Sequence, residues 1–198
     1  VDCVGPYGVN LVVATGNQRL DQDLALCIKH QVPVILTSKG APGEVFDEVH
    51  AYGGVVFHDI GAARHAEIAL SAGADGLIAV CGGAGGHCGT LNPFALVNEV
   101  RQMTDKAIIL AGAISTGRDV LTAQVMGANM VYMGTRFINT EESGAVDCYQ
   151  QMIIEASATD IFFGTIADTA PSNLLTPSLL RAGVKLDELR RQDPDAIL

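Results

Sequence analysis

The sequence GLIAVCGGAGGHCG, residues 76–89, joins an apolar run to a loop rich in glycine. The first part, Gly76–Cys81, is typical of a buried strand. The second part, Gly82–Gly89, contains five glycines and one histidine, His87. Glycine lets the backbone adopt positive φ values and approach a ligand closely. His87 is therefore predicted to face a ligand at the C-terminal end of a strand, and a flexible connection with an incidental histidine is the alternative.

The same succession of apolar strand and helix-like segment repeats along the chain. Strands are predicted at 9–14, 32–37, 55–58, 76–81, 107–111 and 130–133, and helices at 20–30, 43–52, 62–72, 93–103, 118–126 and 143–158. Continuous Val, Ile and Leu runs indicate a parallel sheet buried on both faces, and no antiparallel hairpin is expected. Two α/β architectures have this pattern, a doubly wound sheet and a (β/α)8 TIM barrel. With six βα units, a barrel implies that its first two units are missing from this chain.

Length and composition favour a single domain with one sizeable core, because the chain has 198 residues of which 48% are hydrophobic. Residues 1–160 are predicted to form the partial barrel. Residues 161–198 are predicted to be a C-terminal extension of helix and loop that packs on the barrel. The acidic end of this extension is expected to be loose.

Charge and cysteine content exclude several classes of protein. The net charge of −10 disfavours nucleic acid and anionic membranes as partners, and neither a membrane-spanning run nor a signal peptide is recognised. The five cysteines are scattered without a CxxC pair, so neither a metal site nor a disulfide framework is predicted, and a cytoplasmic location fits best. Cys88, next to His87, is a poor candidate nucleophile because no third group is placed to orient the pair.

Two further glycine turns follow the last two predicted strands. The strand ending at Ala111 leads into Gly112-Ala113, and the strand ending at Met133 leads into Gly134-Thr135. In a barrel, the loops after the last two strands form the usual phosphate site. A helix cap at Ser115 or Thr116, with Gly134 only relieving crowding, is the alternative. Since GxGxxG and Walker A motifs are absent, a compact phosphate ester such as FMN fits better than a dinucleotide.

Four segments resemble the nitronate monooxygenase family, once called 2-nitropropane dioxygenases. They are PYGVNLVV (6–13), VVFHDIGAARHAEIALSAGAD (55–75), GAGGHCGTLNPFALVNEVR (83–101) and AGAISTGRDVLTAQVMGANMVYMGTRF (111–137). The resemblance runs from about Pro6 to beyond Glu142. It implies an FMN-binding (β/α)8 barrel of which this chain holds strands 3 to 8, related to FMN-dependent enoyl-ACP reductases.

The resemblance also implies roles for individual residues. His87 matches a histidine near the flavin that binds substrate or abstracts a proton, which suits an imidazole at neutral pH. The residues implied in FMN binding are Gly85, Gly86, Ala111, Gly112, Ala113, Met133, Gly134 and Thr135. The chain departs from the family at two positions: Ala113 stands where a second glycine is usual, and Asp59 stands where some members have a lysine near the flavin.

The activity implied is FMN-dependent oxidation of an alkyl nitronate with molecular oxygen, giving a carbonyl compound and nitrite or related nitrogen oxides. The nearest alternative is an NAD(P)H-dependent flavin reductase of the enoyl-ACP reductase or quinone reductase type. An alternative of another class is a non-catalytic barrel that binds a phosphate ligand. The apolar composition favours self-association, for example as a homodimer.

Other polar residues have simpler interpretations. Lys39 follows the predicted strand 32–37 and is expected to be a solvated loop lysine, with approach to a substrate acid as the alternative. A structural role is favoured for His58, which ends a predicted strand, and for the mid-helix His65. Arg136 has two interpretations, a phosphate contact or a salt bridge to Glu141 or Glu142.

Overall fold

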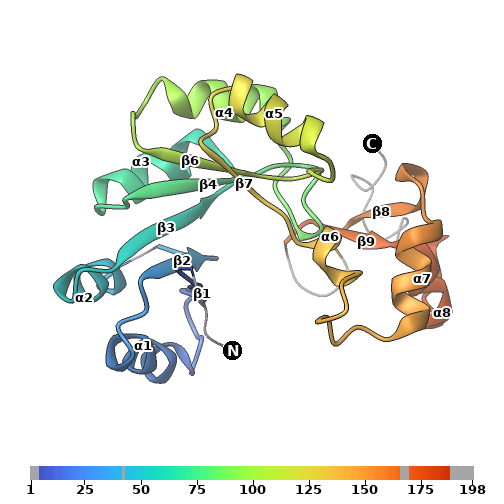
Figure 1. The fold of residues 1–198 in the computed structure, drawn as a ribbon, viewed down its shortest axis with the longest axis horizontal. Helices are drawn as coiled ribbons and strands as arrows, with labels where there is room; N and C mark the ends of the chain where they lie inside the picture. Colours follow the sequence, from blue (N-terminus) through green and yellow to red (C-terminus); the bar gives the residue numbers. More distant parts are fainter. Residues whose placement is uncertain (1–4, 42, 166–169, 188–198) are drawn as a thin grey trace.

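The computed structural model describes residues 5–41, 43–165 and 170–187 (Figure 1). Its centre is a six-stranded parallel sheet in which the strands follow one another in chain order. These strands are β1 (Gly8–Val12), β2 (Val34–Ser38), β3 (Val55–Ile60), β4 (Gly76–Val80), β6 (Ala107–Ala111) and β7 (Met130–Tyr132). The segments predicted as strands therefore form this sheet, with boundaries that differ by up to two residues.

Helices between these strands cover one face of the curled sheet (Figure 1). They are α1 (Leu20–Lys29), α2 (Val45–Ala51), α3 (Ala63–Ser71), α4 (Pro93–Arg101) and α5 (Gly117–Val125). A doubly wound sheet would reverse its strand order at a switch point and carry helices on both faces. Consecutive strand order with helices on one side is the pattern of a barrel. The chain thus forms a curled half-barrel, and the missing two units stay a prediction.

Along each strand, successive side chains point to opposite faces of the sheet. Ile35, Val56 and Leu77 point to the helices and are fully buried, as are Phe46 of α2 and three side chains of α4, Leu96, Val97 and Val100. Full burial of such a side chain stabilises the fold by about 1.5–3 kcal/mol. The opposite face, toward the inside of the half-barrel, carries Asp59, paired in register with Ile78 of β4.

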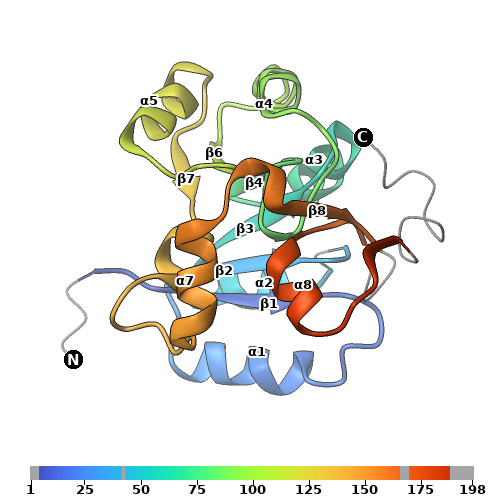
Figure 2. The same ribbon diagram turned by 90° about the vertical axis from the view of Figure 1, so that its right-hand side faces the viewer.

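A second, smaller sheet lies at the end of the parallel sheet where the strands lead into their loops, and Figure 2 looks onto this end. It joins β5 (Gly86–His87), β9 (Ser172–Leu175) and β8 (Ile161–Gly164) in antiparallel pairs. The prediction of no antiparallel pairing is therefore wrong. β5 has only two residues and pairs with a strand far along the chain, with His87 opposite Ser172. β8 and β9 have four residues each and follow one another in the chain, with Gly164 opposite Ser172. Strands this short show too little periodicity for a sequence pattern to reveal them.

The remaining described elements surround this small sheet. They are α6 (Thr135–Ile138), α7 (Asp147–Glu155), the short 3-10 helix η1 (Ala158–Asp160) and α8 (Thr176–Arg181). The helix predicted at 143–158 is shorter than expected, and the extension from residue 161 contains strands as well as a helix. Its acidic end, residues 188–198, lies outside the described residues. None of the helices in the described part combines the length and apolar character needed to cross a bilayer.

Candidate functional site

The glycine loop 82–89 packs directly against the turns that follow β6 and β7. A Cβ atom added at Gly83 would lie 2.7 Å from the Cβ of Ala113, and one added at Gly85 would lie 2.8 Å from Oγ1 of Thr135. Real Cβ contacts are longer than this, so close packing leaves no room for a side chain at Gly83, and one at Gly85 would have to displace the hydroxyl of Thr135. The three glycine-bearing segments predicted to surround a ligand are therefore in contact with one another.

The turn after β6 is held by hydrogen bonds within the protein. The backbone N–H of Ala113 donates to the carbonyl of Gly83 at 2.9 Å, and Ala113 has a φ of 55°, in the left-handed region. The N–H groups of Ser115 and Thr116 donate to the carboxylate of Asp119, and these bonds lower the pKa of that carboxyl. Thr116 is thus the cap of α5, as the alternative interpretation predicted, and the N–H of Ala113 binds the loop.

The turn after β7 is more open. Gly134 precedes α6, and a Cβ added there would meet no atom within 4 Å. Thr135 is the first residue of α6, so its N–H belongs to the helix turn that lacks intrahelical acceptors. Met133 lies half-buried just beyond β7, while Ala111 at the end of β6 is buried and accepts from the N–H of Cys81 at 2.9 Å.

A residue from the C-terminal part of the chain fixes the glycine loop. Asn173 of β9 donates from Nδ2 to the carbonyls of Gly82 and Ala84, at 2.7 and 2.8 Å. The same strand pairs with β5, so that His87 lies opposite Ser172. The sequence analysis missed Asn173, because its partners lie about 90 residues away in the chain and its own surroundings, SNLL, carry no distinguishing motif.

His87 contacts a lysine that the sequence did not connect to it. The Nζ atom of Lys39 lies 3.0 Å from Nε2 of His87, and both residues are exposed. Lys39 follows β2 and has a φ of 58°. The expected solvated loop lysine is instead in hydrogen-bond contact with the central histidine. The one available signal was its position, immediately after a predicted strand and before Gly40.

Asp59 lies on the inner face of the sheet, at the end of β3. Its Oδ1 atom is buried and accepts no hydrogen bond from the described residues. Burial raises the pKa of Asp59 to about 6, because the charged carboxylate is stabilised less well away from water. The neighbouring His58 points the other way, toward α2.

The other histidines have structural partners. Nδ1 of His58 lies 2.8 Å from Oγ1 of Thr37, and its buried ring meets Phe46 edge-on; burial lowers its pKa. His50 pairs with Asp75 at 2.9 Å, and Nδ1 of His65 accepts from the N–H of Gly61. The structural role favoured for His58 is confirmed.

Neither cysteine near the loop has the character of an activated nucleophile. Burial raises the pKa of the Cys81 thiol to about 11 and that of the Cys88 thiol in the same direction. A nucleophilic cysteine needs a lowered pKa. Residues 5–41, 43–165 and 170–187 contain no group of three His, Cys, Asp or Glu side chains arranged to hold a metal ion.

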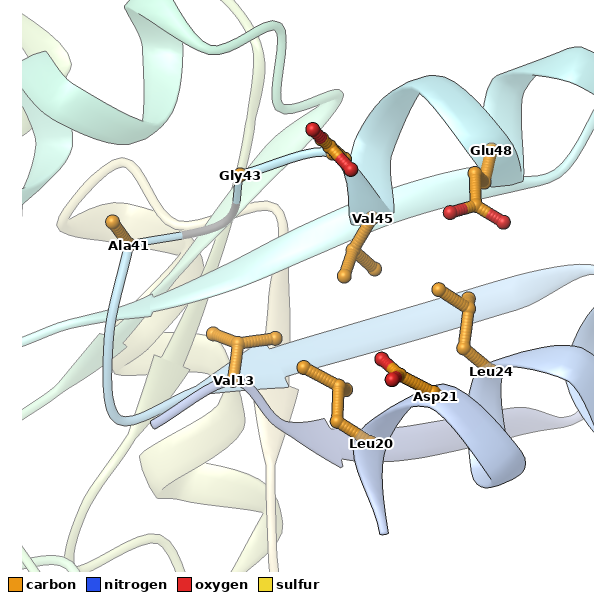
Figure 3. A pocket seen from close by; sticks show the side chains of 9 residues that line it. Val13, Leu20, Asp21, Leu24, Ala41, Gly43, Val45 and Glu48 are labelled. Atoms are coloured by element: carbon orange, nitrogen blue, oxygen red, sulfur yellow. The ribbon is translucent and has the colours of Figure 1, made fainter. Parts of the chain in front are cut away.

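A cavity of about 240 Å³ opens between α1 and α2, on the helix side of the sheet (Figure 3). Val13, Leu20, Leu24 and Val45 line its apolar part, and acidic side chains such as Asp21 stand at its edge. Because three of these four apolar residues belong to the buried core, the cavity is a gap between two helices. The residues predicted to bind a ligand gather instead at the strand ends.

Comparisons with known proteins point to one family. The model of the family described as nitronate monooxygenase matches residues 5–184. The (3aS,4S,5R,7aS)-5-hydroxy-7a-methyl-1-oxo-octahydro-1H-indene-4-carboxyl-CoA dehydrogenase of Rhodococcus jostii (strain RHA1) is 31% identical over 179 residues, 89% of this chain and 50% of that protein. The nitronate monooxygenase of Neurospora crassa is 33% identical over 129 residues, 61% of this chain and 34% of that protein.

A solved structure supports the same grouping. FabK from Thermotoga maritima superposes with a TM-score of 0.84 at 31% identity, over 96% of this chain and 60% of that protein. The chain therefore spans half the length of its Rhodococcus relative and a smaller part of the Neurospora one. The similarity includes the glycine loop, the two strand-end turns and the β8–β9 region, all within residues 5–184.

Proposed function

The chain belongs to the nitronate monooxygenase family, and we propose that it acts as an FMN-dependent oxidoreductase that oxidises alkyl nitronates with molecular oxygen. One observation carries the proposal: the glycine loop, with His87, packs against both strand-end turns. A phosphate at those turns and a flat ring against the loop would then be held by one continuous surface of backbone.

The residues present fit FMN in their chemistry. We assign the phosphate to Gly112, Gly134 and Thr135, where β6 and β7 end, because Gly134 leaves open space beside the first turn of α6. The N–H of Ala113 is bonded to Gly83, so Ala113 would contribute by shaping the loop. Gly85 and Gly86, which lack side chains, would bring the backbone close to the ring.

Ala111 and Met133 end the strands beneath this surface, and we propose that they support it. Arg136, on the first turns of α6, makes no ion pair with any described residue, and we propose it as a counter-charge for the phosphate. When bound, FMN would supply the electron-accepting chemistry.

The chain's own residues would bind and orient the substrate. A nitronate has already lost its α-proton, so its oxidation requires no general base. We therefore propose that His87 serves as a substrate-binding residue in this reaction. FMN and oxygen would carry the electrons, so the task left to the protein's own residues is to hold a planar anion in place and to limit the access of water.

The test is a visible spectrum of the purified protein, kept anaerobic, before and after addition of propionate 3-nitronate. We expect a flavin band that the nitronate bleaches, and slower bleaching in His87→Ala than in the control His30→Ala, which changes an exposed histidine at the end of α1. If the protein carries no flavin and does not bind added FMN, the proposal is wrong and a non-catalytic phosphate-binding barrel is favoured.

A second candidate is a flavin-dependent reductase or dehydrogenase. It is supported by the Rhodococcus relative, which is named as a dehydrogenase of a carboxyl-CoA compound and is 31% identical over 89% of this chain. This candidate predicts that NAD(P)H, and not nitronate, bleaches the flavin band under the same anaerobic conditions.

We also propose a homodimer in the cytoplasm. Leu121 and Val125 of α5 are 61% and 80% exposed, an apolar pair that a second subunit would cover. Cys27, Cys81, Cys88 and Cys148 are all free thiols, which suits a reducing compartment. Light scattering on the purified protein, compared with Val125→Glu, tests the dimer.

A further inference from the structure

We propose that Asp59 takes up a proton when the bound flavin receives electrons, and that this carboxyl sets how the reduction potential of the flavin depends on pH. The inference rests on the proposed function and adds a proton acceptor to the site. On full reduction, the reductant loses two electrons and the flavin gains them. One proton passes from water to the Asp59 carboxylate, in addition to any proton that the flavin itself binds.

The first observation is the position of Asp59 on the inner face of the sheet. It pairs in register with Ile78 of β4, the strand that leads into the glycine loop. Two residues further along β3, a Cβ added at Gly61 would lie 3.9 Å from the Cα of Gly89, at the other end of that loop. Two residues of an extended strand span about 7 Å. The carboxyl therefore lies close to the loop against which the flavin ring is proposed to bind.

The second observation is that the carboxyl lacks a donor. Its Oδ1 atom is buried and accepts no hydrogen bond from the described residues. The register that pairs Thr37 with His58 brings Ser38 of β2 beside Asp59, but the Ser38 hydroxyl donates to Oδ1 of Asn10 at 3.2 Å. Buried polar atoms are almost always bonded, and an exception calls for an explanation such as a redox or catalytic role. Here the carboxyl can gain and lose a proton without breaking an existing bond.

The third observation concerns the charges around Asp59. Titratable side chains reach this end of the sheet from each neighbouring element: Lys39 follows β2, His65 lies on α3, and His87 and Cys88 lie on the glycine loop. Asp59 forms no ion pair with any residue that the structure describes, and burial is what raises its pKa to about 6. Above that pH the carboxylate is ionised, and a further negative charge placed nearby increases its affinity for a proton.

The size of the effect depends on the distance between the two charges. At an effective dielectric constant of about 20, two unit charges about 12 Å apart interact by about 1.4 kcal/mol, which is a factor of ten in an equilibrium constant. The coupling is reciprocal, so reduction raises the proton affinity of Asp59 by the factor by which its proton favours reduction. For a two-electron couple, a factor of ten corresponds to about 30 mV. Close to the loop, the ionised carboxylate should therefore lower the potential by about 30 mV or more.

The same carboxyl has a simpler explanation, in which it is a buried group that the electrons do not affect. The two roles predict different pH dependences of the reduction potential. Asp59→Asn keeps the shape of the side chain and removes its titration. Asp105→Asn is the control, because it removes an exposed carboxylate just before β6, at the opposite end of the sheet.

The first measurement is a ¹³C titration of the aspartate carboxyls in the flavin-free protein, in which Asp59→Asn identifies the Asp59 signal. We expect this carboxyl to titrate at about pH 6, and Asp105→Asn to leave its titration in place. A titration of Asp59 at the ordinary value of 3.8 would mean that the carboxyl is solvated, and it would overturn the proposal. This readout requires neither FMN nor turnover, so it is independent of the proposed function.

The second measurement is the reduction potential of the FMN-loaded protein, titrated anaerobically with dithionite against a reference dye. At about pH 5 the carboxyl holds its proton in both redox states, and at about pH 8 it is ionised in the oxidised protein. Between these two pH values, the wild-type potential should fall by about 30 mV or more beyond the fall in Asp59→Asn. Asp105→Asn should follow wild type.

The third measurement is an infrared difference spectrum between oxidised and reduced protein at about pH 7, which locates the proton. We expect the C=O stretch of a protonated carboxyl to appear on reduction in wild type and to be absent in Asp59→Asn. If FMN binds and the nitronate bleaches it, but the two potentials fall in parallel or no carboxyl band appears, the role of Asp59 alone is overturned. If wild-type protein does not bind FMN, the proposed function fails and this assignment fails with it.

Discussion

Replacing Asp59 with asparagine should stabilise the protein at neutral and alkaline pH. Asp59 lies on the inner face of the sheet with its Oδ1 atom buried and unbonded among the described residues, and burial raises its pKa from 3.8 to about 6. Asparagine has nearly the same shape and no charge. The substitution therefore removes the cost of burying a carboxylate while the packing around β3 is kept.

The magnitude follows from the pKa difference between the unfolded and folded states. At about 1.4 kcal/mol for each pH unit, the change from 3.8 to about 6 corresponds to about 3 kcal/mol. Below about pH 4 both states of wild type hold the proton and the cost is small. As the pH rises toward 6 the unfolded state ionises first, so wild-type stability falls. Above about pH 6 the cost is complete.

Urea unfolding followed by far-UV circular dichroism measures the effect. At pH 8 we expect Asp59→Asn to raise the free energy of unfolding by about 3 kcal/mol, and at pH 4 by less than about 1 kcal/mol. The control Asp105→Asn, at an exposed aspartate, should change it by less than about 0.5 kcal/mol at either pH. A gain at pH 8 no larger than that of the control would refute the reasoning, because the carboxylate would then be solvated in the folded state.

Two further predictions concern the backbone around the glycine loop. Ala113→Gly should raise the free energy of unfolding by about 0.5–1 kcal/mol, because Ala113 has a φ of 55° that glycine adopts without strain. The control Ala72→Gly, at a φ of −79°, should lower the free energy of unfolding by a similar amount. If thermal unfolding shows a loss of stability in both variants, the strain argument is contradicted. Asn173→Ala should cost about 2 kcal/mol, because the carbonyls of Gly82 and Ala84 each lose a hydrogen bond. In Asn173→Ala, hydrogen exchange should accelerate at the backbone N–H of Cys88, which donates to the carbonyl of Pro171. The control Asn98→Ala loses only a local, exposed hydrogen bond to Phe94 and should leave this exchange rate unchanged. An unchanged rate in both variants would mean that Asn173 does not hold the loop.

The parallel sheet was predictable from the sequence because its strands are continuous apolar runs, and such side chains have to be buried in any fold of the chain. The strand Ala107–Ala111 has the predicted boundaries, and α4 begins at the predicted Pro93, where Asn92 caps the helix. Composition could not decide between a doubly wound sheet and a barrel, since both need the same runs. Strand order and the side on which the helices lie distinguish them, and these are properties of the whole chain.

The candidate site was predictable only where glycines mark close approach. Gly83 and Gly85 were singled out by their loop, and the structure packs them against Ala113 and Thr135. The contact between Lys39 and His87 was not predictable, because it joins two loops 48 residues apart through side chains whose types are common on surfaces. The pairing of β5 with β9 was missed for the same reason, since two residues carry no periodicity.

The dependence of the glycine loop on Asn173 has a consequence for the order in which the protein matures during synthesis. The carbonyl of Gly82 emerges 91 residues before the amide that it binds. At translation rates of about 5–20 residues per second, this delay is about 5–20 seconds. During that interval the helices and strands up to β7 can assemble on the ribosome while the loop that carries His87 lacks its anchor. The proposed ligand site is therefore completed last, and a nascent chain stalled before residue 173 should lack the two hydrogen bonds that fix its glycine loop.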